Sequence, residues 1–339
     1  MHDVVKNTKT VLVTGAAGFL GSHLCDALLS HGRRVIGVDD LSHGNRDNLA
    51  EAGKNLDFTF HVLDIADAAK LRAVSQGVEV FAHLAAFKIP RYGNRLQTLM
   101  VNSEGTFNIL EIAAEQKAKF VFTSTSDVYG RNPAVPFSET SESVLGPSTV
   151  ARWAYAASKL FDEHLAWGFS EAHGVPVTIL RIFGSYGPRQ HLSWWGGPQS
   201  VFIDSILNGE NIPIHGDGQQ TRSFTFVADT VAGILAALES SAANNQIINV
   251  GSTHEISIVD LATLIHRLSG GAEPLRLEFV PYKKISGQDY EDVRRRIPDV
   301  AKAEQLLGFK ANVSLEEGLK RTIAWQRAVR SAERAVVAG

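Results

Sequence analysis

The chain has 339 residues, of which 44% are hydrophobic and 20% are charged, and its net charge is −3. This composition supports one large or two modest hydrophobic cores and provides no excess of basic residues for binding nucleic acid. The single cysteine, Cys25, excludes an internal disulfide and favours a reducing compartment. The polar first residues, and the lack of any apolar run near ~18 residues, predict a cytoplasmic protein without a membrane-spanning helix.

Short β-branched apolar runs alternate with helical periodicity through the first half of the chain. We expect strands at 10–14, 34–38, 58–63, 78–86, 120–125 and 175–182, and helices at 20–29, 101–115 and 155–173. Strands that alternate with helices imply right-handed crossovers and a parallel sheet. The predicted fold class is therefore α/β, a Rossmann-type doubly wound parallel sheet with a smaller C-terminal α/β lobe.

The pattern is less regular after residue 185. We expect a loop at 188–199, short strands within 212–226, helices at 226–239, 256–269 and 315–328, and a strand at 247–250. The last of these strands is expected to return to the main sheet. We therefore predict a nucleotide-binding domain at 1–185, to which 226–251 returns, and a substrate-binding lobe at 186–339.

A glycine-rich turn joins the first expected strand to the first expected helix. Gly15, Gly18 and Gly21 fit the pattern G-x-x-G-x-x-G, with Phe19 and Leu20 opening the helix. Glycines there let backbone N–H groups approach a pyrophosphate at a helix N-terminus. The pattern alone is weak evidence, but its place between a strand and a helix predicts a dinucleotide site.

Two carboxylates follow the next two expected strands. Asp39 ends the second strand, where a carboxylate binds both hydroxyls of an adenosine ribose and repels a 2′-phosphate. This favours NAD over NADP, and Arg46 is the one nearby base that argues otherwise. Asp64 and Ile65 follow the third strand and are expected to contact adenine; a helix N-cap is an equally good reading of Asp64.

Tyr155 and Lys159 are four residues apart at the start of an expected helix, so they share one face. A free phenol has a pKa of about 10, and a neighbouring ammonium and an oxidised nicotinamide would both lower it. Thr125 ends a strand, where open α/β sheets place ligands, and can hydrogen-bond the same substrate oxygen. A surface Tyr and Lys is the alternative. The order of the motifs favours an enzyme that takes a proton and a hydride from an alcohol.

With these motifs the chain resembles the extended short-chain dehydrogenase/reductases of the nucleotide-sugar epimerase/dehydratase family. The resemblance covers nearly the whole length. It is carried by residues 13–21, 83–86, 101–106, 124–130, the Tyr155/Lys159 pair, 186–189 and 216–222. It implies a nucleotide-diphosphate sugar, most simply UDP-linked, as substrate, and a homodimer formed through the helices at 101–115 and 155–173.

The resemblance also implies roles for particular residues. It assigns cofactor contacts to Leu84, Ala85, Ala86, Lys88 and Asn102, the last near the nicotinamide or a structural water. It assigns substrate contacts to Lys88, Ser126, Arg189, Arg222, Arg294 and Arg296. Guanidinium groups bind phosphate bidentately, but a triple arginine is more often a solvated face. We therefore expect one member of 294–296 to bind the diphosphate.

Members of this family share oxidation of the sugar 4-hydroxyl to a ketone and differ in the second step. Epimerases return hydride to the other face, UDP-glucuronate decarboxylases lose carbon dioxide, and 4,6-dehydratases eliminate water. The run Thr125-Ser126-Asp127 lacks the Asp-Glu pair of dehydratases. It approaches the Thr-Ser-Glu of decarboxylases with a carboxylate one methylene shorter.

Further residues favour one or another of these reactions. The stretches 152–155 and 296–299 resemble decarboxylases, whereas Lys88 is epimerase-like. Asp127 is a candidate third catalytic group or a loop carboxylate that binds backbone N–H groups. We predict a UDP-hexose 4-epimerase first, a UDP-glucuronate decarboxylase second and a 4,6-dehydratase third. A catalytically silent NAD-sensing protein is the non-enzyme alternative, which the intact Thr, Tyr and Lys disfavour.

Two departures from the family pattern leave the sugar open. Gly184 stands where relatives often carry a substrate-contacting Asn, and is expected to enlarge the pocket. Trp194 and Trp195 are expected either to cap a sugar or nucleobase or to pack at a subunit interface.

Overall fold

The computed structural model describes residues 9–88, 94–270, 274–286 and 292–338. Its centre is a seven-stranded sheet in the order β11-β6-β5-β4-β1-β2-β3, in which every neighbouring pair is parallel. The strands are β1 (Thr10–Thr14), β2 (Arg34–Asp39), β3 (Phe58–Val62), β4 (Val80–His83), β5 (Lys119–Thr125), β6 (Val177–Ile182) and β11 (Gln246–Val250). The predicted α/β fold with a parallel sheet is confirmed.

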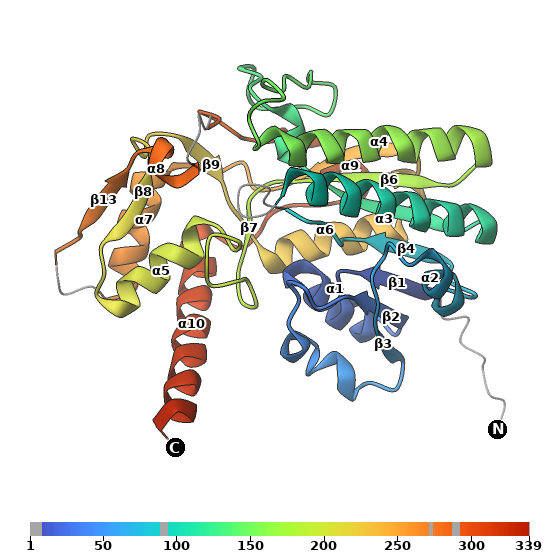
Figure 1. Cartoon of the computed structure of the whole chain (residues 1–339), viewed down its shortest axis with the longest axis horizontal. Helices are drawn as coiled ribbons and strands as arrows, with labels where there is room; N and C mark the ends of the chain where they lie inside the picture. The colour runs from blue at the N-terminus through green and yellow to red at the C-terminus, as the bar shows by residue number, and fades with distance from the viewer. Residues whose placement is uncertain (1–8, 89–93, 271–273, 287–291, 339) are drawn as a thin grey trace.

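Helices cover both faces of this sheet (Figure 1). They are α1 (Phe19–Ser30) and α6 (Val227–Glu239) on one face, and α2 (Ala68–Val74), α3 (Arg95–Gln116) and α4 (Trp153–His173) on the other. Successive side chains of a strand point to opposite faces, so Val121 packs with α1 and α6 while Phe120 and Phe122 pack with α3 and α4. This is why the strands are apolar throughout rather than alternating.

The strand order places a crevice at one defined point of the sheet. Strand β1 lies between β2 and β4, so the chain leaves β1 in one direction and later continues on its other side. In open α/β sheets, ligands bind outside the carboxyl ends of the strands at such a reversal. The loops after β1, β2, β4 and β5 therefore meet at one edge.

A smaller lobe lies beside that edge (Figure 1). It contains α5 (Pro198–Asn208), β8 (Ile212–His215), β9 (Thr221–Ser223), β12 (Glu255–Ser257), α7 (Ile258–Leu268), β13 (Leu277–Val280), α8 (Tyr282–Ser286) and α10 (Leu315–Ala338). Short strands β7 (Ser185–Tyr186) and β10 (Thr225–Phe226) lie between the lobe and the sheet, and helix α9 (Ala301–Leu307) packs against β11 and α6. The hydrophobic core of the lobe is continuous with the α1/α6 side of the sheet.

The expected elements differ from the observed ones mainly at their ends. Helix α3 begins at Arg95 rather than 101, because Asn94 caps it by accepting the Gln97 N–H. Helix α7 begins at Ile258, because Glu255–Ser257 pairs with β9 as a strand. The expected loop at 188–199 ends in α5, which opens at Pro198.

The strand at 246–250 joins the main sheet beside β6. The boundaries between the two domains stay a prediction.

Among the described residues, none of the helices combines the length and apolar character needed to cross a bilayer. The polar first residues, on which the expectation of a cytoplasmic protein partly rests, lie outside the described part of the chain.

Candidate active site

A cavity of about 1250 Å³ opens between the carboxyl ends of the strands and the smaller lobe. Most of the residues predicted for the site line it. They are Gly15, Gly18, Phe19, Leu20, Gly21, Asp39, Asp64, Ile65, Leu84, Ala85, Ala86, Lys88, Thr125, Ser126, Asp127, Tyr155, Lys159, Arg189, Arg222 and Arg296. Two predicted residues, Asn102 and Arg294, lie elsewhere. The residues predicted from the sequence therefore gather around one cavity. The position of each one in that cavity has to be taken from the structure.

The glycine turn after β1 is shaped for close backbone contact. Gly15 has φ +69°, and a Cβ added to it would lie 2.9 Å from the Ala85 backbone N. A Cβ on Gly21 would lie 2.0 Å from the Gly15 carbonyl oxygen. No side chain caps the N-terminus of α1 at Gly18, so its first N–H groups face the cavity. A side chain at either position would collide with the backbone that shapes this turn, so the two glycines permit the close backbone packing typical of a pyrophosphate-binding turn.

The Asp39 carboxylate lines the cavity beyond this turn. Asp39 is 8% exposed and accepts N–H groups from Ala17 at 3.0 Å and Leu41 at 2.8 Å. Burial raises the pKa of its carboxyl above the ordinary value, and these backbone N–H groups offset part of the rise. Arg46 lies over the Phe60 ring rather than among the cavity-lining residues. Among the described residues, the cavity is thus lined by the Asp39 carboxylate and not by Arg46.

Asp64, the carboxylate after β3, does not cap a helix. Asp64 lines the cavity and its Oδ1 accepts the Ala66 N–H at 2.9 Å. The N-cap of α2 is Asp67, whose carboxylate accepts the Lys70 N–H. The N-cap reading of Asp64 is therefore wrong, and Asp64 orders a turn beside Ile65, while its contact with adenine stays a prediction.

Asn102 supports the wall of the cavity from behind. It is 1% exposed, accepts the Phe87 N–H at 2.7 Å and donates to the Ser158 hydroxyl at 2.9 Å. These contacts tie α3 to the loop after β4 and to α4. Asn102 therefore supports the loop after β4 and does not itself line the cavity.

Thr125, Tyr155 and Lys159 meet at the carboxyl end of β5. Thr125 hydrogen-bonds the Tyr155 phenol, and Lys159 Nζ donates to the Thr123 carbonyl at 3.0 Å. Burial raises the pKa of the Tyr155 phenol, and the Asp127 anion raises it further. Burial lowers the pKa of Lys159 to about 8. The sequence predicted a lowered phenol pKa; the chain's own groups act the other way, because a buried phenolate close to a carboxylate is unfavourable.

Asp127 stands in a cluster of arginines just beyond Thr125. Its Oδ1 lies 2.7 Å from Arg296 Nη2 and 3.4 Å from Arg152 Nη2. Burial alone would raise the pKa of this carboxyl, but Arg296, Arg152 and Arg222 together hold it below the ordinary value. Burial also lowers the pKa of the Arg296 guanidinium, to about 10. Asp127 is thus an anion fixed between guanidinium groups.

A second carboxylate, Asp292, extends this cluster. Arg222 Nη2 donates to it at 2.7 Å, Arg152 Nη1 at 3.0 Å and the Tyr282 hydroxyl at 3.1 Å. Arg222 also donates to the Val293 carbonyl, so it is held from two sides. We name Asp127, Arg152, Arg222, Asp292 and Arg296 the arginine cluster. Asp292 was not predicted, because nothing in the sequence links it to Arg152.

Only one of the three consecutive arginines faces the cavity. Arg294 pairs with Asp217 and Arg295 with Glu255, and both arginine side chains are more than half exposed. Arg296 is 14% exposed at its side chain and lines the cavity. The structure thus brings Arg296 to the site and leaves Arg294 on a solvated turn.

Arg189 belongs to the cofactor side of the cavity. It has φ +66° and pairs with Asp26 at 2.7 Å, on the helix that begins at the glycine turn. His23 on the same helix bonds the Pro188 carbonyl at 3.0 Å. These contacts anchor the start of the loop that leads to Trp194 and Trp195.

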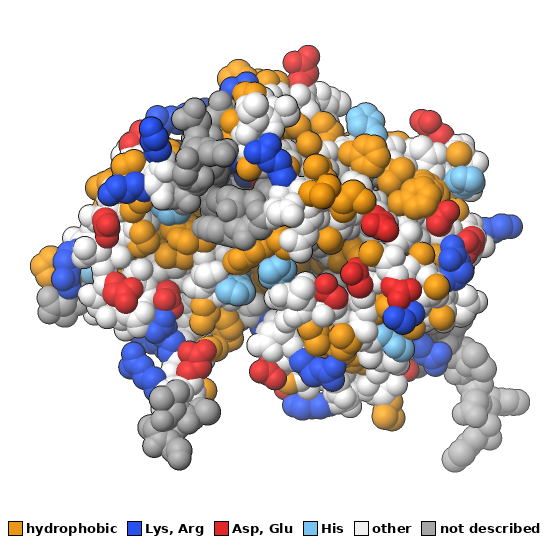
Figure 2. Space-filling view, in the orientation of Figure 1, with side chains coloured by type: hydrophobic (Ala, Val, Ile, Leu, Met, Phe, Trp, Pro, Cys, Tyr) orange, Lys and Arg blue, Asp and Glu red, His pale blue; other side chains and the backbone are white. Residues whose placement is uncertain are grey.

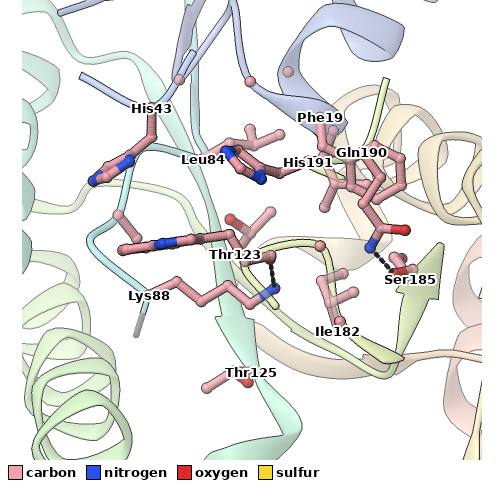
Figure 3. Close-up of a pocket in the computed structure, with 18 of the residues that line it drawn as sticks. Phe19, His43, Leu84, Lys88, Thr123, Thr125, Ile182, Ser185, Gln190 and His191 are labelled. Carbon is pink, nitrogen blue, oxygen red and sulfur yellow. Dashed lines mark hydrogen bonds between the residues drawn. The ribbon is translucent and has the colours of Figure 1, made fainter. Parts of the chain in front are cut away.

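The two tryptophans line the cavity and hold its two sides together. Trp195 stacks on His43 with ring centroids 4.3 Å apart and meets Phe87 edge-on at 5.4 Å. Lys88 Nζ donates to the Trp195 carbonyl at 3.2 Å. Figure 3 shows His43 and His191 on one side of the pocket, Thr125 on the other and Lys88 extending between them. Trp194 stacks instead on His215 of β8, at 3.9 Å.

The backbone conformation explains why residue 184 is a glycine, which the sequence alone did not reveal. Its φ is +40°, and an added Cβ would lie 2.2 Å from the Ser223 carbonyl oxygen. A side chain here would collide with the backbone of β9. The glycine therefore allows β6 and β9 to approach, which is a different role from the expected enlargement of the pocket.

Comparisons with known proteins agree with this arrangement. Residues 11–251 match the model of the NAD dependent epimerase/dehydratase family. The chain belongs to that family. As a member of the NAD dependent epimerase/dehydratase family it uses NAD, which fits the glycine cradle and the Asp39 carboxylate. The predictions of family and cofactor are confirmed.

Individual relatives of this epimerase/dehydratase chain differ in their named reactions. It is 36% identical over 323 residues to a UDP-N-acetyl-alpha-D-glucosaminuronate decarboxylase of Bacillus cytotoxicus, covering 95% of this chain and 98% of that protein. It is 34% identical to UDP-glucuronic acid decarboxylase 1 of Xenopus tropicalis, covering 95% of this chain and 73% of that protein. A UDP-glucuronic acid 4-epimerase from Bacillus cereus, solved with UDP-glucuronic acid and NAD, superposes with a TM-score of 0.85 at 31% identity, covering 94% and 99%.

Proposed function

We propose that this protein decarboxylates a UDP-linked hexuronate through a transient 4-ketone. The observation that carries the proposal is the arginine cluster beside Thr125, with Arg296 2.7 Å from Asp127. The relatives named as decarboxylases of UDP-linked uronates support it. The UDP-hexose 4-epimerase that the sequence favoured stays a prediction and is the second candidate.

The charge of the cluster fits an anionic sugar. Three guanidinium groups and two carboxylates leave a surplus of one positive charge in a largely buried region. Guanidinium binds carboxylate bidentately, and a buried charge needs a partner. The substrate carboxylate of a uronate would supply the missing negative charge, whereas the hydroxymethyl group of a hexose would not.

The roles of the residues follow from their positions. NAD, when bound, supplies the hydride acceptor for the sugar 4-position. The glycine cradle and Asp39 would hold its pyrophosphate and ribose, and Lys159 would stand near its nicotinamide end. Tyr155 takes the proton of the 4-hydroxyl, and Thr125 hydrogen-bonds the same oxygen. Arg296, Arg152 and Arg222 orient the substrate carboxylate, and Asp127 keeps Arg296 and Arg152 in place.

The chemistry of the ketone explains why carbon dioxide leaves. A ketone at C4 makes the C6 carboxylate of a uronate a β-keto acid. The C5–C6 bond breaks, its electron pair passes into an enolate at C4–C5, and a proton then adds to C5. Return of the hydride and a proton to the C4 carbonyl restores the hydroxyl, so the product has lost carbon dioxide alone. The surplus positive charge of the arginine cluster stabilises the negative charge that develops on the enolate oxygen.

The test is product analysis. UDP-glucuronate and UDP-N-acetylglucosaminuronate are each incubated with the purified enzyme, and the nucleotide products are separated and weighed by mass spectrometry. The expected product is lighter by one carbon dioxide, and the gas is trapped in parallel. UDP-glucose serves as the control and should release none.

The 4-epimerase is kept for a specific reason. Thr125, Tyr155 and Lys159 suffice for epimerisation, and the Bacillus cereus neighbour is a 4-epimerase of UDP-glucuronic acid. A product of unchanged mass with inverted configuration at C4, and no released gas, would contradict decarboxylation and establish this candidate.

We also propose that two copies of the chain associate through α3 and α4. Large apolar side chains are exposed on these helices, as the hydrophobic surface in Figure 2 shows. They are Leu96, Leu99, Met100, Phe107 and Phe161. Light scattering on the wild type and on Phe161→Asp tests this: the wild type should have the mass of two chains and the variant that of one. A wild type with the mass of one chain would contradict it.

A further inference from the structure

The two members of the Asp127–Arg296 pair are carried by segments that share a neighbour. Asp127 belongs to the short 3-10 helix Ser126–Tyr129, which follows β5. Arg296 belongs to the segment 292–299, between α8 and α9. The distance of 2.7 Å between the two charged groups depends on how these segments are held. The side chain of Asn249, near the end of β11, contacts both of them.

Asn249 is buried and uses both ends of its amide. It is 0% exposed. Its Oδ1 accepts the Tyr129 hydroxyl proton at 2.7 Å. Its Nδ2 donates to the carbonyl oxygens of Phe137 at 2.8 Å and Asp299 at 3.2 Å. Because the two carbonyls can only accept, they identify the NH₂ end of the amide and fix its orientation.

The hydrogen bond to Tyr129 reaches the segment that carries Asp127. Tyr129 is the last residue of that short helix and is 0% exposed. Its ring stacks on Phe137 with centroids 4.6 Å apart, and the Arg181 guanidinium lies over it, 4.8 Å from the ring centroid. The position of the helix is therefore fixed by the ring and the hydroxyl of Tyr129 together.

The hydrogen bond to Asp299 reaches the segment that carries Arg296. Just beyond Arg296 the chain pairs with Phe137, whose N–H donates to the Ile297 carbonyl at 2.8 Å and whose carbonyl accepts the Asp299 N–H at 2.8 Å. Asn249 donates to the carbonyls on both sides of this pairing. The amide thereby fastens the backbone that follows Arg296 to the end of β11.

The other edge of this segment is held by the smaller lobe. The Thr221 N–H of β9 donates to the Arg294 carbonyl at 2.8 Å, and the Ser223 N–H donates to the Arg296 carbonyl at 3.4 Å. Arg296 is therefore tied to the lobe on one side, while Asn249 ties the residues after it to the main sheet. The spacing between lobe and sheet at Arg296 thus depends on the Asn249 amide.

We propose that Asn249 is a positioning residue for recognition of the substrate carboxylate. Its amide holds the two segments at the spacing at which Arg296 pairs with Asp127 and faces the cavity. This rests on the proposed binding of a uronate at the arginine cluster. Asn249 acts through Arg296 and is not among the residues that line the cavity.

Loss of the amide should affect a uronate more than a hexose. Asn249→Ala removes the two hydrogen bonds that fasten the backbone after Arg296, so the guanidinium is no longer held in one place. A hexose lacks the carboxylate that Arg296 would bind, so its affinity should change less. We expect the preference for a UDP-uronate over the matching UDP-hexose to fall by about tenfold, as for the loss of buried hydrogen bonds.

The experiment measures binding in an enzyme that cannot turn over. The Tyr155→Phe holoenzyme is titrated by calorimetry with UDP-glucuronate and UDP-glucose, and with UDP-N-acetylglucosaminuronate and UDP-N-acetylglucosamine. The ratio of the two dissociation constants in each pair is the carboxylate preference. It is measured again with Asn249→Ala, with Arg296→Lys and with both changes added.

The double variant shows whether Asn249 acts through Arg296. Beside Arg296→Lys, Asn249→Ala should lower the preference by less than about twofold, because the group that it positions is already gone. A residue with only a structural role would lower the affinity for both members of a pair and would have the same effect in either background.

Two further variants address the stability of the fold. Tyr129→Phe removes the hydroxyl that donates to Asn249 and keeps the ring on Phe137, so the preference should fall by about threefold. Asn245→Ala is the matched control. Asn245 lies just before β11 and accepts the Val177 N–H at 3.2 Å, at the other end of the strand. This change should lower the thermal stability and leave the preference unchanged.

Each outcome decides for or against the proposal. A reduced preference in Asn249→Ala that disappears beside Arg296→Lys, with Asn245→Ala unchanged, supports it. An effect of equal size in both backgrounds, or a parent enzyme that prefers neither uronate, overturns it. If Asn249→Ala does not fold, an unchanged preference in Tyr129→Phe overturns it. Carbon dioxide release is measured separately on the active enzyme, so a preference for a uronate without release would contradict decarboxylation alone.

Discussion

The Asp127 carboxylate and the Arg296 guanidinium are 2.7 Å apart, although the two residues are far apart in the sequence. Asp127 follows β5 of the main sheet, and Arg296 lies between α8 of the smaller lobe and α9. The pair joins the two parts of the protein at the position where the sugar is expected. It also separates Arg296 in function from its two neighbours, which bind Asp217 and Glu255 on the surface.

Arg296→Lys should lower the rate of carbon dioxide release from UDP-glucuronate by about 100-fold, because an ammonium cannot bind a carboxylate bidentately. Reduction of NAD in the first half-reaction should fall much less. The matched control is Arg294→Lys, since Arg294 pairs with Asp217 away from the cavity. Equal losses in the two variants would contradict the role of the arginine cluster.

Tyr155→Phe should reduce turnover by about 10²- to 10⁴-fold, because it removes the group that takes the 4-hydroxyl proton. The fold should survive, since the change removes a single oxygen. Thermal unfolding followed by circular dichroism and the content of bound NAD are the controls, and both should match the wild type. Unchanged activity would exclude the phenol from the reaction.

Asp39→Asn should narrow the preference for NAD over NADP by about tenfold or more, because the neutral amide no longer repels a 2′-phosphate. Binding of both cofactors to the stripped enzyme is measured by calorimetry. Asp57→Asn is the control, since Asp57 is exposed and is not among the residues that line the cavity. An unchanged preference in Asp39→Asn would assign cofactor choice to other groups.

Trp195→Ala and Trp194→Ala should separate the cofactor from the substrate. Trp195 closes over the cofactor side through His43 and Phe87, so its loss should speed release of NAD, measured after rapid dilution. Trp194 stacks on His215 in the smaller lobe, so its loss should raise KM for the nucleotide sugar instead. The same phenotype in both variants would mean that the loop moves as one unit.

Asp292→Asn should lower the free energy of unfolding at pH 7 by about 3 kcal/mol, as when a buried ion pair loses one partner. Burial alone would raise the pKa of Asp292, but Arg222, Arg152 and Arg296 hold it well below 3.8. The folded protein therefore binds fewer protons than the unfolded chain. The stabilisation is complete above about pH 4 and is lost as the pH falls further.

Urea unfolding at several pH values checks this. The difference between wild type and Asp292→Asn should shrink below about pH 4, where the carboxyl of the unfolded chain becomes protonated. A difference that stays constant from pH 7 to pH 3 would show that the ion pairs of Asp292 do not carry its effect.

Local patterns in the sequence were enough to predict the sheet, the cofactor and much of the cavity. The turn at Gly15, the carboxylate at Asp39 and the Tyr155/Lys159 spacing each depend on residues close together in the chain. Such features express backbone and helix geometry, which acts over a few residues. Periodicity likewise located most helices and strands, with errors at the ends, where caps such as Asn94 decide.

The tertiary structure alone decided which charges meet. Asp292 reaches Arg152 and Arg222, Arg296 reaches Asp127, and Arg294 does not reach the cavity. Burial and the Asp127 anion raise the pKa of Tyr155. Electrostatic energies depend on distance and on removal of water, and neither quantity can be read from positions along the chain.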